Sequence, residues 1–298
     1  MSAIPELDDL LYKLIAENYD ERYKAKHDII KYGTAAVEPL IQFLGKREAI
    51  GSGLLIVDAL GVIGDKRAVE PLKAVLSDPA NFDDSLLRKY TAWALGKLKD
   101  ARATDELINV LHDRIHEEDD DGYITDEPDR ETIAAAVWAL AEIGDPRAVK
   151  PVLERIFEGD FWAEGSVLTS WGNDALKLLL TALDNDNENI RDTACALLGE
   201  FGDVSAVEQL IHRLKTDASD RVRGSAAYAL SEIADPRAYD ILLTALNDRY
   251  EHVRAKAATG LGRLKDNRAL YALRQATHDE SPQVRNSANW AIDWLNQA

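Results

Sequence analysis

The sequence lacks the features that mark a membrane, secreted or nucleic-acid-binding protein. No apolar run reaches the ~18 residues that a membrane-spanning helix needs, and the first residues, MSAIPELDDLL, contain no basic segment followed by an apolar one. Lysine and arginine form no cluster, and the net charge of -18 repels phosphate backbones and anionic lipids. We therefore expect a cytoplasmic protein that binds neither nucleic acid nor membranes.

The sequence also lacks the short motifs of most enzyme classes. It contains no glycine-rich phosphate loop, nucleophile elbow, paired-cysteine metal site or His-Glu-x-x-His helix. The single cysteine, Cys195, excludes an intrachain disulfide. Sister segments carry Ala227 and Ala258 at the same position, so we predict a small buried thiol rather than a catalytic nucleophile. These absences favour a non-enzymatic protein that requires no cofactor.

What the sequence contains is an internal repeat. Residues 222–246 read VRGSAAYALSEIADPRAYDILLTAL, and residues 136–156 (AVWALAEIGDPRAVKPVLERI) and 56–76 (IVDALGVIGDKRAVEPLKAVL) follow the same pattern. Each copy places an amphipathic segment before a turn and a second one after it. The turns recur, at intervals of about thirty residues in most cases, at Gly33, Asp65, Asp100, Asp145, Gly172, Asp203, Asp235 and Asp266. Such a period built from helix pairs is typical of an α-solenoid.

We therefore predict an all-α superhelix, a solenoid of about nine helix pairs that forms a single domain over residues 1–298. In each pair we name the first helix outer and the second inner. The outer helices are predicted at 5–17, 34–45, 67–77, 103–115, 147–157, 173–183, 205–215, 237–247 and 267–278. The inner helices are predicted at 19–32, 50–63, 84–98, 129–143, 161–171, 187–201, 219–233, 250–264 and 281–296.

Individual positions of the repeat have predictable structural roles. A glycine such as Gly144 precedes the turn, where a helix end commonly needs a left-handed residue. The turn aspartate can cap the next helix, and Pro146 or Pro236 then occupies the first helical position. Arginine recurs near the start of the inner helices, at Arg88, Arg191, Arg223, Arg254 and Arg285. We predict that these arginines donate hydrogen bonds to neighbouring turn carboxylates and carbonyls rather than bind a ligand.

This pattern resembles a known repeat family. The residues that carry the resemblance are Val222-Arg223, Ala226-Ala227, Ala229-Leu230 and Asp235-Pro236-Arg237-Ala238, with Ala68-Val69-Glu70-Pro71-Leu72 at the start of an outer helix. They are similar to the HEAT-like repeat of the phycobilisome-lyase type, and the similarity extends over nearly the whole chain. Proteins with this repeat include bilin lyase subunits, assembly factors and binding scaffolds. The resemblance implies a right-handed superhelix whose inner helices line a concave surface.

An acidic insertion at residues 116–130, inside the fourth pair, departs from the repeat, and two turns are 45 residues apart there. Aligned with a calcium-binding EF-hand loop, it offers oxygen ligands from Glu117, Asp119, Asp121 and the carbonyl of Tyr123. Pro128 occupies the place of the bidentate glutamate, so Glu127 or Asp129 would have to substitute for it. Calcium binding is one interpretation, and a solvated acidic loop without metal is the other.

Aromatic residues are scarce, at 7% of the chain, but several fall in one position of the inner helices, seven residues before the turn. That position faces away from both the partner helix and the next repeat. It holds Trp93, Trp138 and Tyr228, and we assign to it His27, six residues before Gly33, and Trp290 of the last inner helix, with Tyr90 and Trp294 about one helical turn away. Aromatic anchors supply large contact areas in partner-binding surfaces. Trp290 and Trp294 have a second interpretation, in which they cover the open end of the array.

These observations leave three functional hypotheses. The first is a non-enzymatic scaffold or assembly factor that binds a protein or peptide on its concave face through the aromatic residues. The alternative is a phycobilin lyase or bilin-handling subunit, in which the same rings stack on a tetrapyrrole. The third is a calcium-responsive adaptor, in which the ion orders the acidic insertion.

Overall fold

The computed structural model describes residues 5–45, 53–78, 85–118, 124–159 and 165–297. The chain divides into two compact units, Met1–Ala163 and Glu164–Ala298, and each is described here by itself. The single domain expected for residues 1–298 stays a prediction. None of the described helices combines the length and the apolar character that crossing a membrane requires.

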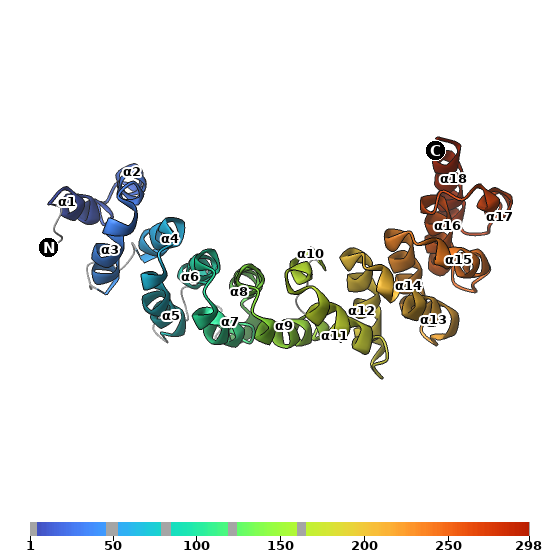
Figure 1. Ribbon diagram of the computed structural model, residues 1–298, viewed down its shortest axis with the longest axis horizontal. Helices are drawn as coiled ribbons and strands as arrows, with labels where there is room; N and C mark the ends of the chain where they lie inside the picture. The colour runs from blue at the N-terminus through green and yellow to red at the C-terminus, as the bar shows by residue number, and fades with distance from the viewer. Residues whose placement is uncertain (1–4, 46–52, 79–84, 119–123, 160–164, 298) are drawn as a thin grey trace. The chain divides into compact units, whose positions relative to one another are not determined.

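The first unit is built from helix pairs in two layers. Its helices are α1 (Pro5–Lys13), α2 (Tyr19–Ile30), α3 (Val37–Leu44), α4 (Gly53–Ile63), α5 (Val69–Ser77), α6 (Ser85–Leu98), α7 (Thr104–Val110), α8 (Arg130–Ile143) and α9 (Val149–Phe157). The inner helices α2, α4, α6 and α8 pack side by side in sequence order. The outer helices α3, α5, α7 and α9 form the other layer (Figure 1).

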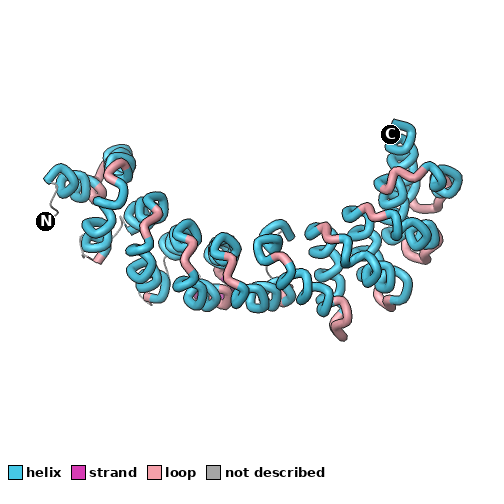
Figure 2. Tube along the Cα trace, viewed as in Figure 1, coloured by secondary structure: helices cyan, strands magenta, loops and turns pink. Residues whose placement is uncertain are grey.

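The second unit repeats the same architecture. Its helices are α10 (Gly165–Leu168), α11 (Asn173–Ala182), α12 (Glu188–Phe201), α13 (Val207–Thr216), α14 (Asp220–Ile233), α15 (Tyr239–Ala245), α16 (Glu251–Arg263), α17 (Leu270–Ala276) and α18 (Pro282–Gln297). The inner helices α12, α14, α16 and α18 again pack consecutively. Loops join the consecutive helices α11 to α18, as Figure 2 shows in pink.

Most of the predicted helix pairs are confirmed in the described residues, with one regular difference at the outer helices. The exception is the inner helix predicted at 161–171, where the described residues form only the short helix α10 (Gly165–Leu168) and a 3-10 turn at Thr169–Trp171. Most of the outer helices begin two or three residues later than predicted because the residues after the turn form a single 3-10 turn, such as Pro236–Ala238 before α15. The inner helices match more closely; α14 spans Asp220–Ile233 where 219–233 was expected. The predicted burial of Cys195 is also confirmed, with no exposed surface, and burial raises the pKa of its thiol.

The predicted outer helix at 103–115 is wrong at its end. Helix α7 stops at Val110, and the insertion begins as strand β1 (Arg114–Glu118), paired antiparallel with β2 (Ile124–Pro128). The backbone N–H of Asp129 donates to the carbonyl of Asp113 and closes the base of this hairpin, at 3.1 Å. The physical reason is local: isoleucine and threonine in these segments favour extended backbone. An EF-hand has a helix directly before its loop, whereas a strand lies before the insertion here.

At several of the turns an aspartate and an arginine hold the turn and link it to the preceding repeat. Asp235 accepts the backbone N–H of Arg237 at 2.9 Å, which confirms its predicted capping role. The guanidinium of Arg237 donates hydrogen bonds to both carboxylate oxygens of Asp235. It also donates to the carbonyl of Val204, one repeat earlier, at 2.8 Å. The hydrogen bond from Arg237 lowers the pKa of Asp235. The same link to the preceding repeat is made by Arg67, Arg102 and Arg147.

The arginines of the inner helices form the predicted ladder between repeats. Arg223 donates from Nε and Nη2 to the two carboxylate oxygens of Asp248, at 2.8 and 3.1 Å, and from Nη1 to the carbonyls of Asp217 and Ala218. Asp248 belongs to the next loop, so each such arginine joins two repeats. Equivalent carboxylate pairs are Arg191 with Asp217 and Arg254 with Asp279. The prediction of a structural role for these arginines is confirmed.

Candidate aromatic and ligand-binding surfaces

Three of the predicted aromatic residues meet on the first unit. Trp93 of α6 and Trp138 of α8 lie with ring centroids 5.9 Å apart, and the ring of Tyr90 meets Trp93 edge-on at 6.4 Å. All three side chains are half-buried. The Nζ of Lys97 lies 3.6 Å from the centroid of the Trp93 ring. The result is a partly exposed aromatic surface with one cation beside it, which we call the tryptophan cluster (Tyr90, Trp93, Lys97 and Trp138).

A glycine sets the distance between the two helices of the tryptophan cluster. A Cβ atom on Gly96 of α6 would lie 2.6 Å from Cα of Ala139 and 2.8 Å from a ring carbon of Trp138. The backbones of α6 and α8 can approach this closely only because Gly96 has no side chain. The same contact brings the Trp138 ring into reach of Trp93.

We expect Gly96→Ala to lower the free energy of unfolding by about 1–2 kcal/mol, because overpacking costs about 1–3 kcal/mol and the helix preference of alanine offsets only part of it. Thermal unfolding followed by circular dichroism measures the change. Gly45→Ala is the matched control, since its added Cβ would meet only the Gln42 carbonyl at 3.9 Å. Equal stability of Gly96→Ala and the wild type would show that the close approach of the helices is not required.

Toward the start of the chain the aromatic row is interrupted by an ion pair. Lys26 of α2 and Asp58 of α4 form a salt bridge of 2.7 Å, with side chains only 9% and 13% exposed. Asp58 occupies the repeat position that Trp93 has on α6. His27 is exposed on α2, and its Nδ1 lies 2.8 Å from the carbonyl of Tyr23. His27 is therefore not part of the tryptophan cluster.

The second unit has a groove on its inner helices α12, α14 and α16, which the sequence did not predict. Its volume is about 310 Å³, and it is lined by Asp192, Arg221, Gly224, Ser225, Tyr228, His252 and Lys256. Tyr228 was predicted as a binding residue, and here the Nζ of Lys256 lies 4.7 Å from its ring centroid. The other polar residues lie about one or two helical turns before the aromatic position on their helices, and this spacing is the signal that could have identified them.

Trp290 and Trp294 stack on each other on α18, with centroids 5.3 Å apart, and are 40% and 41% exposed. In α16, Gly262 lies on the face that packs against the next inner helix, where an added Cβ would lie 2.7 Å from Ala291. At the equivalent position of α18 the residue is Asp293, so the same face of α18 is polar. Asn286 and Asn289 likewise replace the buried Ala255 and Ala258. Polar residues thus lie beside the tryptophan pair on α18, and both interpretations of the pair, as a cover and as a binding site, stay predictions.

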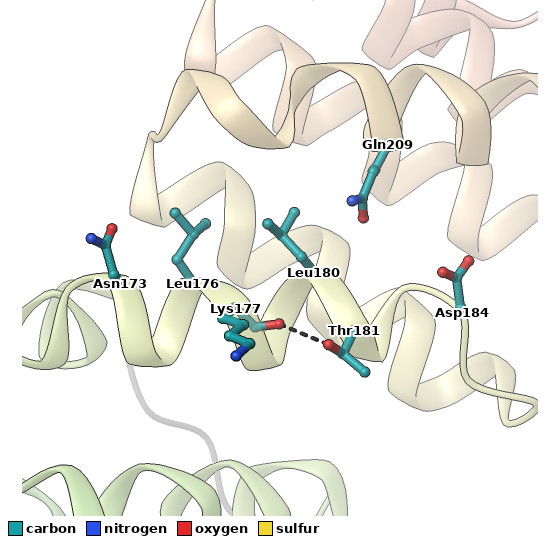
Figure 3. Close-up of a pocket in the computed structure, with 7 residues that line it drawn as sticks. All are labelled: Asn173, Leu176, Lys177, Leu180, Thr181, Asp184 and Gln209. Atoms are coloured by element: carbon teal, nitrogen blue, oxygen red, sulfur yellow. Dashed lines mark hydrogen bonds between the residues drawn. The ribbon is translucent and has the colours of Figure 1, made fainter.

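A second groove lies on the outer helices of this unit. Figure 3 shows Leu176 and Leu180 on α11 facing the side of α13 that carries Gln209. The hydroxyl of Thr181 donates to the carbonyl of Lys177 at 2.9 Å, within the same helix. This groove, of about 560 Å³, contains none of the predicted binding residues.

The calcium interpretation is not tested by the described residues. Glu117 lies in β1 and Glu127 in β2, whereas Asp119, Asp121 and Tyr123 lie outside the residues that the structure describes. The buried Asp129 caps α8: its Oδ1 accepts the N–H of Thr132 at 3.1 Å and the hydroxyl of Ser85 at 2.9 Å. Within the described ranges, no group of three histidine, cysteine, aspartate or glutamate residues is placed to hold a metal ion. Calcium binding stays a prediction.

Two repeat families match the chain. The family described as HEAT repeats matches residues 165–231 and 207–293, in the second unit. The family described as PBS lyase HEAT-like repeat matches residues 56–78, 87–113 and 133–156, all in the first unit. The last two of these segments contain Trp93 and Trp138.

The chain is also similar to individual proteins. The bilin biosynthesis protein PecF of Mastigocladus laminosus is 32% identical over 125 residues, which are 40% of this chain and 55% of that protein. The match thus spans about half the length of that relative. The crystal structure of Kap121p aligns with 98% of this chain and 38% of its own, at 11% identity and a TM-score of 0.55, which supports the solenoid fold. The complex of CpcE and CpcF of phycocyanin lyase from Nostoc aligns with 99% of this chain and 96% of that chain, at 20% identity and a TM-score of 0.39.

Proposed function

Because this chain is a HEAT-repeat protein that contains PBS lyase HEAT-like repeats, we propose that it handles a bilin, as a subunit of a bilin lyase or as a bilin-binding partner. The tryptophan cluster of the first unit is the proposed binding surface. The observation that carries this proposal is the contact between Trp93 and Trp138, whose rings come from two consecutive segments with PBS lyase similarity. The similarity to the bilin biosynthesis protein PecF supports the same class of ligand.

The chemistry of the cluster suits a bilin. A bilin is an open-chain tetrapyrrole with broad conjugated rings and two propionate carboxylates. Aromatic side chains favour offset stacking on such rings, and Trp93, Trp138 and Tyr90 offer three half-buried rings close together. Lys97 beside Trp93 supplies a cation for a propionate. Among the described residues, no carboxylate forms a salt bridge with Lys97, so its charge is available.

We expect free phycocyanobilin to bind the wild-type chain with a red shift of its visible absorbance, and Trp93→Ala/Trp138→Ala to bind it roughly tenfold to hundredfold more weakly, as the loss of central aromatic anchors does. Absorbance titration measures both. Tyr271→Ala is the matched control, because Tyr271 is an aromatic residue on the outer helix α17 with 77% exposure.

A further variant separates binding from folding. Lys97→Glu leaves the rings in place and reverses only the charge beside Trp93, so it should also weaken binding of the propionate-bearing ligand. If the tryptophan and the lysine variants both bind phycocyanobilin as strongly as the wild type does, the tryptophan cluster is not the bilin site.

The second unit favours a second function, binding of a protein partner. The specific observation is the stacked pair Trp290 and Trp294, which stays substantially exposed on an inner helix next to a polar row. Exposed aromatic anchors with polar surroundings are typical of protein-binding surfaces. In this proposal the solenoid acts as a scaffold that brings a partner protein to a bilin held by the first unit.

A further inference from the structure

We infer that the inner groove of the second unit, between α12, α14 and α16, binds an acidic peptide segment of a partner protein. The inference goes beyond bilin binding, since it concerns other residues in the other unit. It gives a chemical identity to the partner of the scaffold.

The groove contains two cationic side chains, Arg221 and Lys256, in a strongly acidic chain. The Nζ of Lys256 lies 4.7 Å from the ring centroid of Tyr228. Among the described residues, no carboxylate forms a salt bridge with Lys256. The guanidinium of Arg221 is 59% exposed and uses two of its nitrogens, on Asp192 and Asn189. A guanidinium has five N–H donors, so Arg221 retains donors for a ligand.

The one carboxylate that lines the groove is already satisfied. The Oδ1 of Asp192 accepts the hydroxyl of Ser225 at 2.6 Å, and its Oδ2 accepts Nη2 of Arg221 at 2.7 Å. Its charge is thereby balanced within the groove. What remains for a ligand is the ammonium of Lys256, the outer edge of Arg221 and the face of Tyr228.

The floor of the groove depends on a small residue. A Cβ atom on Gly224 would lie 2.8 Å from Cδ2 of His252, so the imidazole packs against the backbone of α14. Nε2 of His252 lies 3.0 Å from the carbonyl of Asp220, which fixes the ring at the edge of the groove. An extended peptide can therefore lie across α14 and α16 and place carboxylates near Lys256 and Arg221.

Charge complementarity selects the occupant. With a net charge of -18, most of the chain repels acidic segments, so an acidic peptide gains attraction only where cations lack partners. Tyr228 adds an apolar face for the peptide backbone or side chains. A nucleic acid is less suited, because it needs an extended positive surface for its many phosphates.

Fluorescence anisotropy tests the inference with a labelled peptide of alternating glutamate and alanine at low ionic strength. We expect binding of this peptide and none of the equivalent glutamine–alanine peptide. Lys256→Glu should weaken binding by roughly tenfold or more, because it removes a charge-assisted contact and adds repulsion. Lys177→Glu is the matched control, with the same charge change at an exposed position on the outer helix α11, and should change binding by less than about twofold.

The outcomes are distinct. Equal binding of the glutamate and glutamine peptides, equal losses in Lys256→Glu and Lys177→Glu, or binding of single-stranded oligothymidine in place of the glutamate peptide would each overturn the inference. Phycocyanobilin titration of the same variants separates the two proposals. Lys256→Glu should leave the absorbance shift unchanged, because Lys256 is not in the tryptophan cluster.

Discussion

Asp58→Ala is expected to destabilise the first two repeats by about 3 kcal/mol, near the lower end of the range for removing one partner of a buried ion pair. The variant leaves the ammonium of Lys26 between α2 and α4, where the residue is only 7% exposed. The ring of Tyr23 lies 4.4 Å from this ammonium and offsets part of the loss. In a solenoid such damage stays largely in the adjacent repeats.

Hydrogen exchange with mass spectrometry measures this local effect. A loss of about 3 kcal/mol corresponds to exchange roughly a hundredfold faster, and we expect it in α2 and α4 but not in α12 to α18. The control is Asp58→Leu/Lys26→Met, which replaces both charges by apolar groups of similar size and should be nearly neutral. If Asp58→Ala and the double variant exchange alike, the ion pair has no structural role.

Arg223→Ala should lower the free energy of unfolding of the second unit by about 3–5 kcal/mol, since it removes one partner of a largely buried charged pair. Asp248 loses both of its hydrogen bonds from Arg223, and the carbonyls of Asp217 and Ala218 lose a donor. The side chains of Arg223 and Asp248 are only 9% and 14% exposed. Urea unfolding followed by circular dichroism measures the loss.

The last repeat supplies the matched control. Arg285 has the same position on α18, and its Nη1 donates to the carbonyls of Asp279 and Glu280, each at 2.8 Å. Among the described residues no carboxylate pairs with Arg285. Arg285→Ala should therefore cost less, about 1.5–3 kcal/mol, the range for a hydrogen bond that involves a charged group. Similar losses for the two variants would show that the carboxylate pair adds nothing to the ladder.

The loss of stability caused by Arg223→Ala should depend on pH, because Asp248, the partner of Arg223, is a titratable group. Burial alone would raise the pKa of this carboxyl, but hydrogen bonds from Arg223 and from the backbone of Tyr250 lower it below its ordinary value of 3.8. A carboxyl whose pKa is lower in the folded state than in the unfolded state stabilises the folded chain at pH values above its unfolded-state pKa. This contribution is lost as the pH falls through its folded-state pKa. The stability difference between the wild type and Arg223→Ala should hence be full at neutral pH and shrink below about pH 3.8.

The fold could be predicted well from the sequence because the same pattern of residues recurs in successive repeats. The turn at Asp235-Pro236-Arg237 has related copies along the chain, so helix boundaries at one copy support those at the others. The inner-helix arginines were also predictable, since Arg191, Arg223 and Arg254 have the same neighbours in each repeat. The insertion has no sister copy, and its hairpin was missed.

The candidate sites were only partly predictable, because they depend on contacts between repeats. The spacing placed Trp93 and Trp138 in one row but could not give the 5.9 Å between their rings, which requires the absence of a side chain at Gly96. The row itself is not continuous, because Asp58 interrupts it to pair with Lys26. Lys256 was missed for a similar reason: its role depends on Tyr228 of a different helix.

The most direct test of bilin handling is to locate the bound ligand. Hydrogen exchange of the chain with and without saturating phycocyanobilin shows which backbone segments the ligand protects. The proposal predicts protection in α6 and α8, the helices of Trp93 and Trp138, with α17 unchanged. Protection confined to the second unit, or none at a concentration that shifts the absorbance, would contradict it.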